Sequence, residues 1–264
     1  MARLNYQVRH FQIENLKIEI YASRAEAGAA AAEATAATLK LLAPQRESIG
    51  VIFATGASQL ETLRALVKLP GLPWDRIHGF HMDEYVGIAP DHIASFRRYM
   101  RHELTQRIPI HSFFEVDGSA ADPLGFCRKY AEALHEADPQ LCLLGIGENG
   151  HLAFNDPGVA DFNDPQDMKV VALDLECKQQ QVAEGWFPSI AEVPSRAMTL
   201  TIPALMRVPR LIVSVPGSRK AEIVNRTLHD SITTVCPATI LRTHPDATVY
   251  LDEESAAELK ELTD

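Results

Sequence analysis

The chain has 264 residues, of which 46% are hydrophobic, and a formal net charge of −10 at pH 7. This length can bury one large core, so we expect a single domain over residues 1–264. The negative charge argues against nucleic-acid and anionic-membrane surfaces, because both need clustered Lys and Arg. No apolar run approaches a bilayer span, and the N-terminus lacks the apolar core of a signal peptide. We therefore expect a cytoplasmic protein that binds neither nucleic acid nor membrane. Its four cysteines are scattered along the chain, and we expect them to be small buried side chains.

The first predicted elements are a strand and a helix. Residues 16–22 alternate apolar and polar side chains, which is typical of a strand covered on one face. Ser23 and Glu26 fit a capping box at the start of an Ala-rich segment with high helix propensity. The predicted helix runs through Leu42, since Pro44 cannot continue it.

A second strand, residues 49–54, is followed by a loop of small residues and a helix over residues 59–69. Such a loop can bind an anion, because exposed backbone N–H groups and the positive end of a helix dipole favour phosphate. The alternative is an ordinary tight turn. Two hydroxyl groups favour the phosphate site, whose candidate residues are Thr55, Gly56, Ala57 and Ser58.

A third strand, residues 77–82, ends in the carboxylates Asp83 and Glu84. Ligands of parallel α/β sheets bind at the carboxyl ends of strands, so both residues are site candidates. The alternative is that Asp83 caps a turn. An amphipathic helix over residues 96–108 follows, and four arginines are expected on its solvated face: Arg97, Arg98, Arg101 and Arg107.

The stretch over residues 141–157 carries the strongest functional signal. It begins as an apolar run without alternation, typical of a strand buried in a parallel sheet, and breaks at two glycines. His151, Asn149 and Asp156 lie in the loop that follows. An imidazole near a carboxylate at a strand end is a recurrent catalytic arrangement, and the alternative is a glycine turn with a solvated His.

The C-terminal part continues the alternation of strands and helices. The polar residues 158–167 lack periodicity and form a candidate lid. A strand over residues 211–215 leads into a glycine turn and a helix with Lys220 in its first turn. A Lys there is unfavourable unless an anion compensates it, so Lys220 is a candidate phosphate ligand. The other predicted elements are helices over residues 123–137, 175–186, 238–242 and 253–262 and strands over residues 168–173, 197–202 and 248–251.

Four segments together resemble the glucosamine-6-phosphate deaminase (isomerase) family, in a wider group that includes 6-phosphogluconolactonases. They are Thr55-Gly56, residues 82–87 (MDEYVG), residues 145–155 (GIGENGHLAFN) and residues 217–220 (GSRK). The resemblance spans nearly the whole chain. It implies a Rossmann-like α/β fold, with a mostly parallel central sheet flanked by helices on both faces. It also implies conversion of glucosamine 6-phosphate to fructose 6-phosphate and ammonia without a metal or organic cofactor.

The resemblance also implies roles for individual residues. Asp83 matches the base that moves a proton between C1 and C2, a step that a carboxylate with access to both carbons can perform. His151 matches the proton shuttle that opens the sugar ring, and Asp156 matches the carboxylate that orients it. Glu84 and Lys220 are expected to bind the substrate or its phosphate.

The chain departs from the family pattern at three positions. Asn149 stands where the family usually has Asp, which removes a negative charge. Asp156 stands where Glu is usual and is one methylene shorter, a change to which catalysis is sensitive. Trp186 lies near the place of a phosphate-gripping Arg, for which the possible substitutes are Arg196, Arg219 and Arg242.

Three functions are compatible with these residues, and all of them involve a sugar phosphate. The first is the deaminase, the second is a hydrolase of sugar-phosphate lactones, and the third is a non-catalytic sugar-phosphate sensor. Residues 82–85 and 154–157 resemble the deaminase branch, whereas Asn149 and Trp186 make the sensor plausible. The family includes monomers and allosteric hexamers, so a homo-oligomer is possible.

Overall fold

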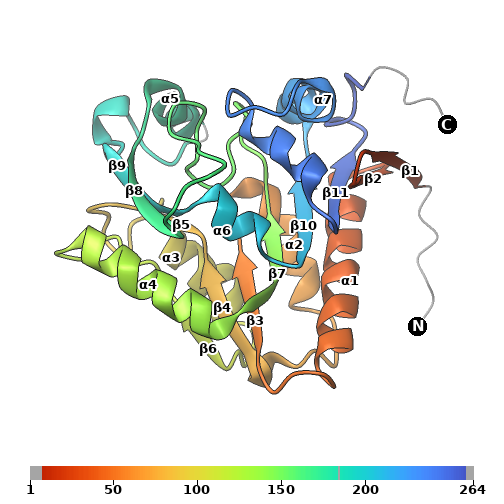
Figure 1. Cartoon of the computed structure of the whole chain (residues 1–264), viewed down its shortest axis with the longest axis horizontal. Coiled ribbons are helices and arrows are strands. Elements are labelled where there is room, and N and C mark those ends of the chain that lie inside the picture. Colours follow the sequence, from red (N-terminus) through yellow and green to blue (C-terminus); the bar gives the residue numbers. More distant parts are fainter. Residues whose placement is uncertain (1–7, 184, 260–264) are drawn as a thin grey trace.

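The computed structural model describes residues 8–183 and 185–259, and its strands lie in two sheets (Figure 1). The larger sheet has the strand order β1-β2-β11-β10-β7-β3-β4-β6, in which only β1 pairs antiparallel with its neighbour. Its strands are β1 (Arg9–Ile13), β2 (Leu16–Tyr21), β11 (Ala247–Asp252), β10 (Arg210–Val215), β7 (Pro139–Leu144), β3 (Ile49–Phe53), β4 (Ile77–His81) and β6 (Ser112–Phe114). The smaller sheet is antiparallel and consists of β5 (Asp83–Tyr85), β9 (Arg196–Leu200) and β8 (Met168–Ala172).

Helices cover both faces of the larger sheet (Figure 1). One face packs against α1 (Arg24–Leu42), α2 (Leu60–Leu66) and α3 (Phe96–Met100), and the other against α4 (Pro123–Ala137), α6 (Ile202–Met206) and α7 (Ala221–His229). A further helix, α5 (Leu175–Ala183), packs with the smaller sheet. Along β7, Leu141 and Leu143 face the α1 side while Cys142 and Leu144 face the α4 side. The predicted α/β fold is confirmed.

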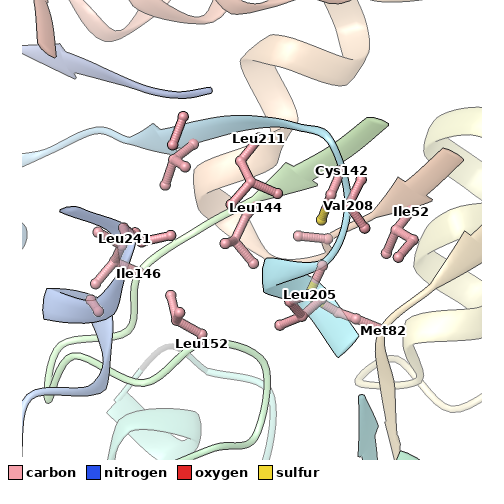
Figure 2. Close-up of a cluster of buried hydrophobic side chains, with 14 of the residues drawn as sticks. Ile52, Met82, Cys142, Leu144, Ile146, Leu152, Leu205, Val208, Leu211 and Leu241 are labelled. Carbon is pink, nitrogen blue, oxygen red and sulfur yellow. The ribbon is translucent and has the colours of Figure 1, made fainter. Parts of the chain in front are cut away.

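The core on the α4 side extends beyond the sheet into the loop after β7. Figure 2 shows Ile146 and Leu152 of this loop packed among side chains from several strands and helices, including Leu144, Leu205 and Leu241. Leu152 is fully buried and Ile146 is 3% exposed. Because two buried side chains anchor the loop, its polar residues are held against the sheet.

Most of the predicted elements are present. Ser23 caps α1, since its hydroxyl oxygen accepts a hydrogen bond from the Glu26 N–H at 3.3 Å, and α1 ends at Leu42. The predicted strands match β2, β3, β4, β7, β8, β9, β10 and β11, with small shifts at their ends. All four cysteines are free and buried, as predicted. Within the described ranges, no helix is long and apolar enough to cross a lipid bilayer.

The predicted solvated face of arginines is wrong for Arg97. Its guanidinium is buried, donates to Asp117 at 2.6 Å and lies 3.7 Å from the fully buried Glu84 carboxylate. A buried carboxylate requires a nearby cation or several hydrogen-bond donors, which explains why Arg97 turns inward. The helix is also shorter than predicted, because α3 continues as a π-helix over Arg101–Thr105.

The predicted C-terminal helix is wrong for the residues that the structure describes. Residues 253–258 form turns, and residues 260–262 lie outside the described ranges. Ser255 donates its backbone N–H to the Asp252 carboxylate at 2.8 Å, while the Asp252 N–H donates to the Ser255 hydroxyl at 3.1 Å. Such local side-chain bonds compete with a helical ladder.

Candidate active site

Loops at the carboxyl ends of β3, β4, β7 and β10 surround a cavity of about 290 Å³. These strands are neighbours in the order β10-β7-β3-β4, so the sheet brings together segments that are distant in sequence. The volume is at the lower end of small-molecule sites. The predicted site residues that line the cavity are Thr55, Gly56, Ala57, Ser58, Asp83, His151 and Lys220.

His151, Asn149 and Asp156 form one hydrogen-bonded network. The Nδ1 atom of His151 lies 2.8 Å from Oδ1 of Asn149 and 3.0 Å from Oδ1 of Asp156. The Asn149 amide also donates to Asp156 at 2.8 Å. Since both neighbours of Nδ1 are oxygen acceptors, a neutral imidazole carries its proton on Nδ1 and keeps Nε2 as an acceptor. The predicted contact between His151 and Asp156 is therefore present.

Asp156 is held in its ionised form by the same network. Burial raises the pKa of this carboxyl group, but the hydrogen bonds from His151 and Asn149 and the attraction of the imidazole outweigh burial, so the pKa lies below its ordinary value. Asn149 and Asp156 are both buried and do not line the cavity. They contact His151, which does line the cavity.

The loop that carries His151 is fixed to β9 as well as to the core. The Asn155 amide donates to the carbonyl oxygens of Leu152 and Leu200 at 2.7 and 2.8 Å. The Phe154 N–H donates to the Thr199 hydroxyl at 3.0 Å. Gly147 packs against the imidazole so closely that a Cβ at this position would overlap the ring. The position of His151 is thus determined by packing on one side and hydrogen bonds on the other.

Asp83 lies where the two sheets meet. Met82 is the single residue between β4 and β5, and its carbonyl oxygen accepts from the Leu200 N–H at 2.8 Å. The Asp83 carboxylate is buried at the cavity wall, and its Oδ1 atom accepts no hydrogen bond from the described residues. Burial, followed by repulsion from Glu84, raises the pKa of Asp83 well above its ordinary value. A carboxylate in this state is a strong proton acceptor.

Glu84 does not line the cavity, and its carboxylate binds the N-terminal end of α3. Its carboxylate accepts hydrogen bonds from the Ser95 hydroxyl at 2.8 Å and from the N–H groups of Phe96 and Arg97 at 3.1 and 3.0 Å. These donors belong to the start of α3, so Glu84 satisfies groups that the helix leaves unpaired. The structure does not bring Glu84 together with the other predicted site residues.

The loops on either side of β7 have similar geometry. Gly56 after β3 and Gly217 after β10 have φ angles of 93° and 95°, which favour glycine, and each precedes a short 3₁₀ turn. The Gln59 amide donates to the Leu144 carbonyl oxygen at 3.1 Å, which ties the first loop to β7. Both oxygens of the buried Asp252 lie 3.0 Å from the Gly217 N–H, which ties the second loop to β11.

Among the residues that the structure describes, three Arg or Lys side chains line the cavity, two of them from the second loop. Arg219 and Lys220 line it, and Arg219 Nε lies 3.3 Å from the Glu148 carboxylate. The third cation, Arg24 at the start of α1, was missed by the sequence analysis. The same unfavourable charge in a first helical turn that indicated Lys220 could have revealed it.

The other arginines suggested as phosphate ligands lie elsewhere. Arg242 is buried and donates to the backbone oxygens of Leu228 and Asp230, and Arg196 is exposed at the start of β9. Trp186 does line the cavity. Across the described residues, no group of three or more His, Cys, Asp or Glu side chains is arranged to hold a metal ion.

A model of the family described as glucosamine-6-phosphate isomerases/6-phosphogluconolactonase matches residues 22–250. The chain belongs to this family. A relative from Geobacillus sp. (strain WCH70), named glucosamine-6-phosphate deaminase, is 32% identical over 209 residues, which cover 77% of this chain and 81% of the relative. A protein of the same name from Exiguobacterium sibiricum is 33% identical over 220 residues, which cover 81% and 83%.

Solved structures of the family have the same fold. A monomeric glucosamine-6-phosphate deaminase superposes with a TM-score of 0.83 at 32% identity, covering 91% of this chain and 99% of the other. A 6-phosphogluconolactonase from Thermotoga maritima superposes with a TM-score of 0.73 at 22% identity, covering 89% and 98%. The second likeness shows the fold alone. The resemblance seen in the sequence is confirmed at the level of family and fold.

Proposed function

We propose that this protein is a glucosamine-6-phosphate deaminase, which converts glucosamine 6-phosphate to fructose 6-phosphate and ammonia. The observation that carries the proposal is the cavity itself, which combines a buried carboxylate of raised pKa, Asp83, an imidazole with a fixed tautomer, His151, and the cation Lys220. The relatives at 32–33% identity that bear this name support it.

In the proposed reaction, His151 opens the sugar ring. Its Nε2 atom accepts the proton of the C1 hydroxyl and delivers it to the ring oxygen, so that the bond from C1 to this oxygen breaks. Oxygen atoms of Asp156 and Asn149 accept hydrogen bonds from the Nδ1–H group throughout and stabilise the imidazolium that forms transiently.

Asp83 then acts on the open chain. Its carboxylate removes the proton from C2, and the electrons of that C–H bond form an enolate whose charge lies on the C1 oxygen. Asp83 then returns this proton to C1, and one proton passes from the C2 iminium nitrogen to the C1 oxygen. The product is an imine at C2, which water hydrolyses to fructose 6-phosphate and ammonia. The buried carboxylate suits both transfers, because a pKa nearer to the working pH improves general acid–base catalysis.

Lys220 and the hydroxyl groups of Thr55 and Ser58 are the proposed phosphate ligands. They line the cavity and come from the loops after β10 and β3, on both sides of β7. Charge-assisted hydrogen bonds to phosphate are stronger than neutral ones, so this end of the cavity supplies binding energy remote from C1 and C2.

The test is release of ammonia by the purified protein from a panel of hexosamine 6-phosphates, with Asp83→Asn as the matched variant. We expect ammonia and fructose 6-phosphate in equal amounts from glucosamine 6-phosphate, and a large loss in the variant. Hydrolysis of 6-phosphogluconolactone without ammonia release would favour a lactonase. Thermal stabilisation by the sugar phosphate without turnover would favour a sensor.

We also propose that residues 1–264 form one domain, which is supported by the parallel pairing of β2 near the N-terminus with β11 near the C-terminus. Its cytoplasmic location and a homo-oligomeric state stay predictions. The similar solved deaminase is described as monomeric. Light scattering on the purified protein distinguishes a monomer from an oligomer.

A further inference from the structure

Arg24 occupies an electrostatically unfavourable position that helix stability does not explain. It is the first residue of α1, directly after the cap Ser23, where the helix dipole disfavours a cation. Its side chain is 44% exposed and lines the cavity together with Ala57 and Ser58. The residue therefore reaches from α1 to the loop that follows β3.

The guanidinium of Arg24 is oriented by two neighbours. Its Nη2 atom donates to the Ala57 carbonyl oxygen at 3.2 Å and to the Glu61 carboxylate at 3.2 Å. Its Nε atom also lies 3.2 Å from Glu61. A guanidinium has five N–H donors, and these contacts use those on Nε and Nη2, which leaves the Nη1 donors for a ligand in the cavity.

We propose that Arg24 is a phosphate-binding residue, which grips the substrate's phosphate from the β3 side while Lys220 binds it from the β10 side. A phosphate monoester carries a charge of roughly −1.5 to −2 at pH 7, so a single Lys does not neutralise it. Arg219 also lines the cavity, but its guanidinium forms an ion pair with the Glu148 carboxylate. Glu61 holds the Arg24 guanidinium in place before the ligand arrives, which reduces the entropy lost on binding. The identity of the sugar rests on the proposed function, whereas binding of a phosphate group by Arg24 does not.

Three variants separate a role of Arg24 in phosphate binding from a structural role of its ion pair with Glu61. Arg24→Gln removes the charge, Arg24→Lys keeps a charge without the planar fork, and Glu61→Gln removes the partner of the guanidinium but leaves the guanidinium itself. Each is assayed for KM and kcat with glucosamine 6-phosphate and for thermal stabilisation by inorganic phosphate. Unfolding midpoints without phosphate should stay near wild type, because exposed ion pairs stabilise little.

We expect Arg24→Gln to raise KM roughly 10- to 100-fold and to reduce stabilisation by phosphate, with a smaller change in kcat. Arg24→Lys should be intermediate, and Glu61→Gln should keep KM within about threefold of wild type. The proposal is overturned if Arg24→Gln leaves KM and phosphate stabilisation unchanged, if Glu61→Gln reproduces the Arg24→Gln defect, or if phosphate does not stabilise the wild type. Phosphate stabilisation that depends on Arg24 in a protein without deaminase activity would refute the proposed function alone.

Discussion

The raised pKa of Asp83 has opposite effects on proton transfer and on the stability of the fold. Burial and the neighbouring Glu84 raise its pKa, which makes it a better proton acceptor. Because its folded pKa lies above the ordinary value of about 3.9, protonation favours the folded state. The contribution to stability is complete below that ordinary value and is lost as the pH rises through the folded pKa. Where the carboxyl group is ionised, it therefore destabilises the fold that positions it.

Asp83→Asn should consequently lower turnover while the protein folds at least as stably. The amide keeps the shape of the carboxylate but accepts no proton, so kcat should fall roughly 10²- to 10⁴-fold. Removal of a buried charge should leave the unfolding midpoint at pH 7 equal to or above that of the wild type. Enzyme assays, denaturant titration and calorimetric binding of glucosamine 6-phosphate check these outcomes, and near wild-type turnover would rule out Asp83 as the base.

His151 and Asp156 should behave as one unit. His151→Gln and Asp156→Asn are each expected to lower turnover of the closed-ring substrate, because the first removes the proposed proton shuttle and the second removes the carboxylate that fixes its tautomer. The double variant should be clearly less impaired than the product of the single effects. Additive losses, measured as kcat/KM in a double-mutant cycle, would show that the two side chains act independently.

For single residues, the sequence predicted which side chains line the cavity better than it predicted the contacts that buried side chains make. Asp83, His151 and Lys220 were found because they follow strands, and strand ends meet in the fold. The inward turn of Arg97 and the capping role of Glu84 could not be found in this way. Both depend on contacts across many positions of the chain, which helical periodicity does not encode.

Among the elements, the loop after β7 restricts the position of its functional side chain, His151. A Cβ on Gly147 would overlap the His151 imidazole, so Gly147→Ala should displace the ring. We expect kcat to fall at least tenfold with a smaller effect on KM, since catalysis is sensitive to misplacement of about 1 Å. Gly158→Ala is the matched control, because nothing lies within 4 Å of a Cβ there. Equal activity of the two variants would contradict the packing argument.

The tie between β11 and the loop after β10 predicts a different kinetic signature. Asp252→Ala removes the acceptor for the Gly217 N–H and should loosen the loop that carries Lys220. KM for glucosamine 6-phosphate should rise several-fold more than kcat falls, because the loop carries the proposed phosphate ligand Lys220. Asp252→Asn keeps one acceptor oxygen and should restore most of the binding. A defect of equal size in both variants would indicate that the charge, rather than the hydrogen bond, matters.

Long and strongly patterned elements were predictable, whereas short ones were not. The helix over residues 123–137 was placed at its observed bounds because Pro123 and Asp138-Pro139 mark its ends. The strands β5 and β6 have three residues each, too few for a period to be visible, and β5 becomes a strand only by pairing with β9. The turn after Asp252 is formed by local bonds between Asp252 and Ser255, which replace the helix that the pattern predicted.

In the molecule as a whole, the larger sheet joins strands that are far apart in the sequence. β2 pairs with β11, and β10 lies between β11 and β7, an order that no local pattern in the sequence encodes. Residues near both ends thus share one sheet with the strands of the candidate active site. This arrangement predicts that the sheet and the cavity unfold together.

The two tryptophans can test this cooperativity. Trp74 lies in the core on the α1 side, while Trp186 packs beside the smaller sheet and lines the cavity. Fluorescence of Trp74→Phe and Trp186→Phe, which report on Trp186 and Trp74 respectively, should give denaturation midpoints that coincide with circular dichroism of the same variant. Separate midpoints would show that the region around the smaller sheet unfolds independently.

The single residue between β4 and β5 restricts where the chain can change in length. Side chains alternate between the faces of a strand, so one residue inserted beside Met82 would turn the Asp83 carboxylate to the opposite side, and no loop is present to absorb the shift. The polar stretch over residues 158–167 belongs to neither sheet and can absorb such changes. Changes in chain length should therefore be tolerated in that stretch and not between the two sheets.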